Sequence, residues 1–233
     1  MPMWGLSPVS CADEFSRTVI DFICNLSSDP EWAGHDIVLM GSSAGSWGAL
    51  RSLIALGEAG LEEGVARNAM NKIKDVILLT PMSFFDQTTE ELEEAGKSVS
   101  RLQSSAFSID NTQDPWLSST LVELVSSLWA HGPTAVPEIF ASLPEHLQAK
   151  ALLWKADTNG VSLSDPRFSP ARGLDVLRRF TQAVPTHRPF RITVFHGTAD
   201  ILYPQSVKLC DMLGALGPSV IHCDFRSVRP ALC

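Results

Sequence analysis

Short apolar runs alternate with amphipathic segments along this chain, and the alternation limits the folds that it can adopt. Four runs have the length and composition of β-strands, at residues 36–40, 75–80, 191–195 and 219–225. Three segments carry apolar residues at helical spacing, at residues 12–26, 46–56 and 205–216. This order predicts an α/β fold with a mostly parallel sheet flanked by helices. The first two runs are nearly continuous in apolar residues, which predicts strands covered on both faces.

One long stretch interrupts the alternation. Residues 84–183 contain no convincing strand, and Thr88 and Glu91 have the spacing of a capping box at the start of a short acidic helix. Further helices are predicted at residues 117–129 and 137–153. Such a block is either a lid over an active site or a set of helices that covers one face of the sheet. We expect a single domain over residues 1–233, with residues 84–183 as a helical, lid-like insertion.

The charge balance excludes some classes of partner. Lys and Arg number 18 against 26 Asp and Glu, a formal net charge of −8, which argues against nucleic acid or an anionic membrane surface. No apolar run approaches the roughly 20 residues that a helix needs to cross a membrane. Residues 1–15 lack the basic start and apolar stretch of a secretory leader. These features predict a cytoplasmic protein, and they do not indicate its oligomeric state.

The cysteines predict reduced thiols rather than a disulfide framework. Five are present, an odd number, and no two have Cys-x-x-Cys spacing. A zinc site from Cys210, His222 and Cys223 is disfavoured because their spacing matches no familiar ligand pattern. We therefore expect no metal.

The motif Gly41-Ser42-Ser43-Ala44-Gly45 follows the first predicted strand and precedes an amphipathic helix. Gly-x-Ser-x-Gly in this position predicts a tight turn that forces the central serine into a strained backbone conformation and exposes its hydroxyl. Small residues on either side, Gly41 and Gly45, are expected to let the two chain segments pass. Ser43 is the candidate nucleophile, and the N–H of Ala44, at the start of the helix, is a candidate oxyanion donor. A phosphate-binding loop is the alternative, but no Gly-Lys-Ser/Thr follows.

A second motif, ending in Asp200, follows the third predicted strand. In a parallel sheet the carboxyl ends of the strands share one edge, so Asp200 is expected at the same edge as Ser43. A carboxylate there can orient a histidine and stabilise its imidazolium. The order serine then aspartate is that of the α/β-hydrolases. The alternative role for Asp200 is to cap the helix that follows.

These motifs together make the chain resemble the hormone-sensitive-lipase-like branch of the α/β-hydrolase family. The matching segments span nearly the whole chain: Leu6-Ser7-Pro8, the serine turn, Leu78-Leu79-Thr80-Pro81, Asp165-Pro166-Arg167-Phe168-Ser169-Pro170 and Gly197 to Asp200. The resemblance implies a carboxylesterase or lipase that acts on short to medium acyl esters. It also implies that no metal or organic cofactor is used.

Two parts of the family pattern are missing. The His-Gly-Gly segment that completes the oxyanion hole lies upstream of the Leu-Ser-Pro-like segment, which here starts at residue 6. No histidine follows the last predicted strand. His222 is the only histidine after Asp200, and it lies inside the predicted strand. The chain therefore looks truncated at both ends, with one edge of the sheet left unpaired.

The sequence thus predicts a serine carboxylester hydrolase that is weak or inactive because its catalytic histidine and the His-Gly-Gly oxyanion segment are missing. Its partner would be a small-molecule ester. Two alternatives stay open: a non-catalytic small-molecule binder that keeps the pocket and the serine, and an inactive fragment of a longer hydrolase.

Overall fold

The computed structural model describes residues 12–32, 34–86, 162–184, 189–197, 202–216 and 221–228, with helical positions at Ala141, Glu145 and Gln148. The strands are β1 (Ile37–Ser42), β2 (Ile73–Leu79), β3 (Phe190–Gly197) and β4 (Ile221–Val228). The helices are α1 (Ala12–Ser28), α2 (Ala44–Glu62), α3 (Gly64–Lys72), the 3₁₀ turn η3 (Pro170–Gly173), α8 (Asp175–Ala183) and α9 (Tyr203–Gly214).

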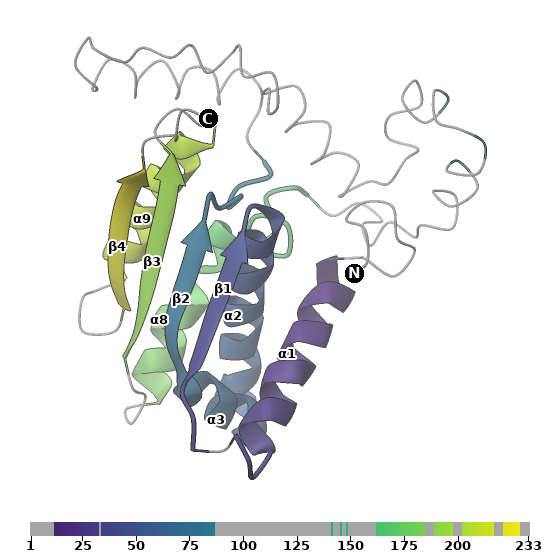
Figure 1. The fold of residues 1–233 in the computed structure, drawn as a ribbon, viewed down its shortest axis with the longest axis vertical. Helices are drawn as coiled ribbons and strands as arrows, with labels where there is room; N and C mark the ends of the chain where they lie inside the picture. Colours follow the sequence, from purple (N-terminus) through teal and green to yellow (C-terminus); the bar gives the residue numbers. More distant parts are fainter. Residues whose placement is uncertain are drawn as a thin grey trace.

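The four strands form one parallel sheet in the order β1-β2-β3-β4 (Figure 1). Each pairs with the strand that follows it in the sequence, so all carboxyl ends meet at one edge. All four predicted strands are confirmed, each with ends shifted by one to three residues. The described part of the chain is therefore an α/β structure built on a parallel sheet, as expected.

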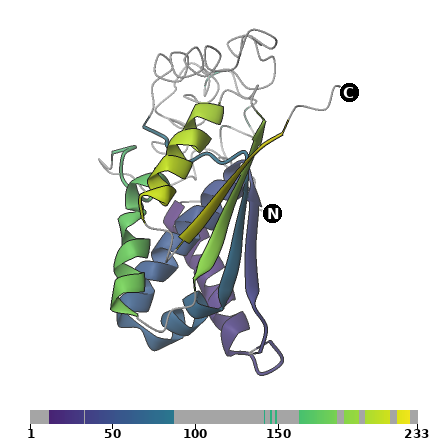
Figure 2. The ribbon, with the colours of Figure 1, turned by 90° about the vertical axis from the view of Figure 1, so that its left-hand side faces the viewer.

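The described helices lie on one face of this sheet, as Figure 2 shows when the sheet is seen edge-on. Helix α2 is central, because it contacts α1, α3, α8 and the first two strands. The predicted apolar face of α2 is confirmed: Leu50, Leu53 and Ile54 are buried in the core that the helices share with the sheet. The helix after β1 is thus fixed in place by packing along its whole length.

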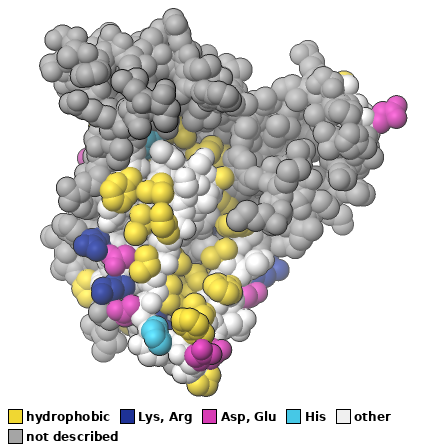
Figure 3. Space-filling view, in the orientation of Figure 1, with side chains coloured by type: hydrophobic (Ala, Val, Ile, Leu, Met, Phe, Trp, Pro, Cys, Tyr) yellow, Lys and Arg dark blue, Asp and Glu magenta, His cyan; other side chains and the backbone are white. Residues whose placement is uncertain are grey.

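The opposite face of β1 is uncovered, which corrects the expectation of a strand covered on both faces. Residues of β1 alternate between half-buried and exposed, and the side chains of Val38 and Met40 are 52% and 65% exposed. Figure 3 shows hydrophobic side chains gathered over this face. The apolar run in β1 therefore did not indicate burial on both faces, because no described helix packs on the second face.

Strand β1 is also an edge of the described sheet. Ser43 donates its N–H to Leu79 on β2, and successive residues of a strand point their N–H groups to opposite sides. The N–H groups of Val38, Met40 and Ser42 therefore point away from β2. No partner strand lies beside them among the described residues.

The block at residues 84–183 is described only at its two ends. Its last helix, α8, is not a lid, because Val176, Leu177 and Phe180 are buried in the core and the helix packs against α2. The capping box at Thr88, the helix predicted at residues 117–129 and most of that at 137–153 lie outside the described residues. The lid-like insertion stays a prediction for that part of the chain. Within the described part, no helix is both long and apolar enough to cross a membrane.

Candidate active site

Ser43 lies in a sharp turn between β1 and α2, at the carboxyl edge of the sheet. Its φ of 51° and ψ of −118° are unusual for a residue with a side chain, and its side chain is exposed. The predicted strain at the central serine is therefore present in the structure. A serine held in this way presents its hydroxyl to solvent from a fixed backbone.

The turn depends on Gly41 more than on Gly45. A Cβ built on Gly41 would lie 2.1 Å from the carbonyl oxygen of Gly45 and 2.5 Å from the nitrogen of Ser46. No described atom lies within 4 Å of a Cβ built on Gly45. We expected both glycines to be needed so that the two chain segments can pass. This is right for Gly41 and wrong for Gly45, where a side chain would meet no described atom. Gly45 contributes only its backbone, because its carbonyl oxygen is the atom closest to a Cβ on Gly41.

The buried hydroxyl of Ser46 stabilises the turn. Ser46 Oγ lies 2.6 Å from the carbonyl oxygen of Gly41 and 2.8 Å from that of Leu79, so its single proton is shared between the ends of β1 and β2. The N–H of Ser43 donates to the same Leu79 carbonyl at 2.8 Å. These contacts fix the position of Ser43 relative to the neighbouring strand.

The first turn of α2 supplies free backbone donors beside Ser43. The carbonyl of Ser43 accepts from the N–H groups of Ser46 at 2.9 Å and Trp47 at 3.2 Å. The N–H of Ala44 has no acceptor among the described residues, as expected for the first residue of a helix. Such a group can donate to an anion, and the helix dipole adds to the attraction.

Helix α2 is tied to the Asp165-Pro166-Arg167-Phe168-Ser169-Pro170 segment directly after the turn. Trp47 Nε1–H donates to the buried carbonyl of Phe168 at 2.7 Å. Within that segment, burial opposes ionisation of Asp165, but hydrogen bonds from the side chain and backbone of Arg167 and the charges of Arg167 and Arg51 outweigh it. The pKa of Asp165 is therefore held below its ordinary value.

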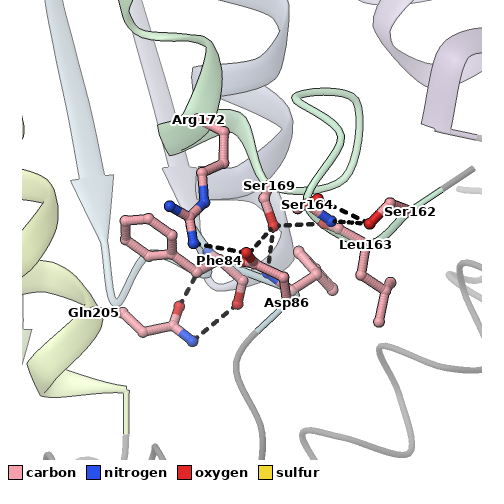
Figure 4. A network of polar contacts seen from close by, with 9 residues as sticks. Phe84, Asp86, Ser162, Leu163, Ser164, Ser169, Arg172 and Gln205 are labelled. Atoms are coloured by element: carbon pink, nitrogen blue, oxygen red, sulfur yellow. Dashed lines mark hydrogen bonds and ion pairs between the residues drawn. The ribbon is translucent and has the colours of Figure 1, made fainter.

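A polar network fixes the chain that leaves β2 beside Ser43 (Figure 4). The Gln205 side chain accepts from the N–H groups of Ser83 (3.1 Å) and Phe84 (3.3 Å) and donates to the carbonyl of Phe84 (3.0 Å). Ser169 Oγ accepts from the N–H of Phe85 at 2.7 Å. Arg172 pairs with Asp86 at 2.7 Å. The segment from Pro81 to Phe85 is buried as a result.

No described histidine lies beside Ser43. His222 is the second residue of β4 and pairs with Arg191, whereas Ser227 pairs with His196 at the carboxyl edge. Five residues of strand, about 16 Å, therefore separate His222 from the level of that edge. His35 precedes β1, at the same far edge as His222.

His196 is at the correct edge but has its own buried partners. Its side chain is 1% exposed, its Nδ1 is hydrogen-bonded to Ser206 Oγ, and its ring packs edge-on against Tyr203 of α9. These contacts indicate a structural role for His196. His131, His146 and His187 lie outside the described residues.

Asp200 also lies outside the described residues. Strand β3 ends at Gly197 and α9 begins at Tyr203, and β3 ends at the same edge as β1. The role of Asp200 as the catalytic acid stays a prediction. Among the described residues no cluster of three or more His, Cys, Asp or Glu is arranged to hold a metal ion.

Comparisons with known proteins support the fold. The chain is similar in structure to a proposed esterase from Staphylococcus aureus, with a TM-score of 0.50 and 15% identity, over 92% of this chain and 51% of that one. It is also similar to an esterase of the bacterial hormone-sensitive lipase family, with a TM-score of 0.47 and 16% identity, over 85% of this chain and 47% of that one. The chain thus spans about half the length of these proteins.

No family model and no curated protein matches the sequence. The structural likeness shows that the fold is part of an α/β-hydrolase fold. At 15% identity the likeness concerns the fold, and the chemistry must be argued from the site.

A second residue near Ser43 has an unusual backbone conformation that no sequence pattern predicts. Thr80, directly after β2, has a φ of 46°, and its N–H donates to the carbonyl of Phe195 at 2.8 Å. The only local signal is a Thr-Pro pair at the end of a strand, which indicates a turn but not its conformation.

Proposed function

We propose that this chain carries the nucleophile of a serine carboxylester hydrolase, with Ser43 as the attacking residue. The observation that supports it is the strained, exposed Ser43 between the end of strand β1 and the free N–H groups of α2. Its substrates would be small esters.

The proposed reaction is acyl transfer in two steps. Ser43 Oγ bonds to the ester carbonyl carbon and loses its proton, and the alcohol leaves with a proton. Water then attacks the acyl-enzyme and releases the acid and the free serine. The N–H of Ala44 would donate to the oxyanion in both steps, and Asp200 would orient the histidine that accepts the proton.

The base is the part of this proposal that the described residues do not supply. A serine hydroxyl without a neighbouring base is a poor nucleophile at neutral pH. We therefore propose slow turnover, with a base drawn from His131, His146 or His187 if one acts. The second candidate is a non-catalytic binder of small molecules, which is favoured by the burial of His196 against α9 and the position of His222 at the far edge.

The test is hydrolysis of p-nitrophenyl butyrate by the 233-residue chain, beside Ser43→Ala and the matched control Ser42→Ala. Ser42 is the neighbouring residue, is also exposed, and lies in regular strand. Activity that disappears in Ser43→Ala and persists in Ser42→Ala would support the nucleophile. Equal rates for all three folded proteins would contradict it and leave the binder.

A more sensitive measurement uses a fluorophosphonate probe, followed by intact mass. Mass addition at Ser43, absent from Ser43→Ala, would detect a reactive serine even when turnover is slow. Replacing His131, His146 and His187 by alanine one at a time then identifies the base, since only loss of the true base should abolish labelling.

A further inference from the structure

Two residues in the left-handed backbone region lie side by side at the carboxyl edge of the sheet. Ser43 and Thr80 are the only non-glycine residues with positive φ in the described part of the chain. Each follows a strand end, and those ends are paired, because Ser42 is the register partner of Leu79. The backbone strain at Ser43 is part of the nucleophile turn. The reaction proposed above assigns no role to the strain at Thr80.

Thr80 is a poor choice of residue for this conformation on two grounds. A β-branched side chain strongly disfavours positive φ, and the following Pro81 restricts Thr80 toward extended conformations. Strain of this kind costs of order 1–3 kcal/mol and persists only where surrounding contacts impose it. Some set of contacts must therefore hold Thr80 in place.

The network around Gln205 and Ser169 is that set of contacts. It begins three residues after Thr80 and bonds the backbone of Ser83, Phe84 and Phe85. The N–H of Ala171 adds a bond to the carbonyl of Ser83 at 3.3 Å. All of these anchors belong to elements on the helix-covered side of the sheet (Figures 2 and 4).

The left-handed turn decides where the chain goes after β2. An extended residue 80 would carry the next residues straight past the sheet edge, about one strand spacing, or about 4.8 Å, from the turn of Ser43. The turn instead directs Pro81 to Phe85 into the helical layer, where they are buried, and Ser43 stays exposed.

We infer that Thr80 is a positioning residue of the Ser43 site: its left-handed backbone, held by the Gln205 and Ser169 anchors, keeps the space beside the Ser43 hydroxyl open. The inference rests on the proposed function for its meaning. Its geometry can be tested without any ester, so the two can fail separately.

The test measures access to position 43 with a thiol in place of the hydroxyl. In a Ser43→Cys background, the rate of alkylation by iodoacetamide at residue 43 is followed by peptide mass spectrometry. Adding Gln205→Leu removes the three bonds to Ser83 and Phe84. We expect alkylation at residue 43 to slow by at least about twofold, because without these bonds the strain at Thr80 favours a turn in which residues 81–85 lie closer to residue 43.

Rescue at position 80 separates positioning from general destabilisation. Adding Thr80→Gly to Gln205→Leu should restore the lost rate, because glycine adopts positive φ without penalty. Adding Thr80→Ala should not, because alanine removes the hydroxyl but keeps the penalty. An unchanged rate in Gln205→Leu, or equal effects of glycine and alanine, would overturn the inference. If Gln205→Leu does not fold, Ser169→Ala, which removes one anchor, takes its place in the same series.

Discussion

The carbonyl oxygen of Gly45 lies 2.1 Å from the point that a Cβ on Gly41 would occupy. The Gly45 oxygen and the Gly41 Cα that would carry this Cβ both belong to the backbone, so neither can move without opening the turn that carries Ser43. The two glycines of one motif therefore have unequal roles, and the difference can be measured.

Gly41→Ala should destabilise the protein by about 1–3 kcal/mol, because the methyl group meets backbone rather than a flexible side chain. Gly45→Ala should be neutral or stabilise by up to about 0.5–1 kcal/mol, because its Cβ meets no described atom and alanine favours a helix. Urea unfolding of both variants checks the prediction. Equal losses in the two variants would contradict it.

Trp47→Phe should lower the free energy of unfolding by about 1–3 kcal/mol. The change removes the bond from Nε1–H to the Phe168 carbonyl and leaves a buried acceptor unpaired. Trp32→Phe is the matched control, since Trp32 is 46% exposed and should cost little. The comparison of the two denaturation midpoints decides the outcome, and similar midpoints would remove the role given to Trp47.

Asp165 should contribute to stability at neutral pH and lose that contribution in acid. Its pKa is lowered in the folded state, so its contribution is complete above the unfolded value of about 3.9 and is lost as pH falls through the folded value. Unfolding measured between about pH 6 and about pH 3 should therefore show a smaller acid loss in Asp165→Asn than in the parent. Asp211→Asn, on α9, controls for the change in net charge, and an acid limb that Asp165→Asn leaves unchanged would contradict the assignment.

The uncovered face of β1, and its edge, which has no partner among the described strands, should drive association of the chain. Val38 and Met40 are exposed on that face, and the backbone N–H groups of the same residues point away from β2. Lysine at either position should reduce concentration-dependent association in sedimentation velocity, because a charge on an edge strand opposes strand pairing. Val65→Lys, at an exposed position on α3, is the control and should change association little.

The order of strands and helices was predictable from the sequence because it follows from the spacing of apolar residues within each short segment. The strand before Ser43 and the apolar face of α2 at Leu50, Leu53 and Ile54 follow from residues close together in the chain. The strained serine was predictable too, since a strand, a Gly-x-Ser-x-Gly motif and a helix in succession leave few ways to turn. Helix α3 was missed because Gly64–Lys72 follows α2 after a single extended residue, and its buried face is short and consists of Ala66, Ala69 and Met70.

Tertiary contacts decided the rest. The bond from Trp47 to Phe168 and the bonds from Gln205 to Ser83 and Phe84 join residues about 120 positions apart, and no local pattern encodes such pairs. The strain at Thr80 exists only because those distant contacts impose it. The exposure of Val38 and Met40 likewise depends on which face the helices cover, and an apolar run reads the same whether one face or both are packed. The sequence by itself determined the local turn that presents Ser43, and the tertiary structure alone decided what surrounds it.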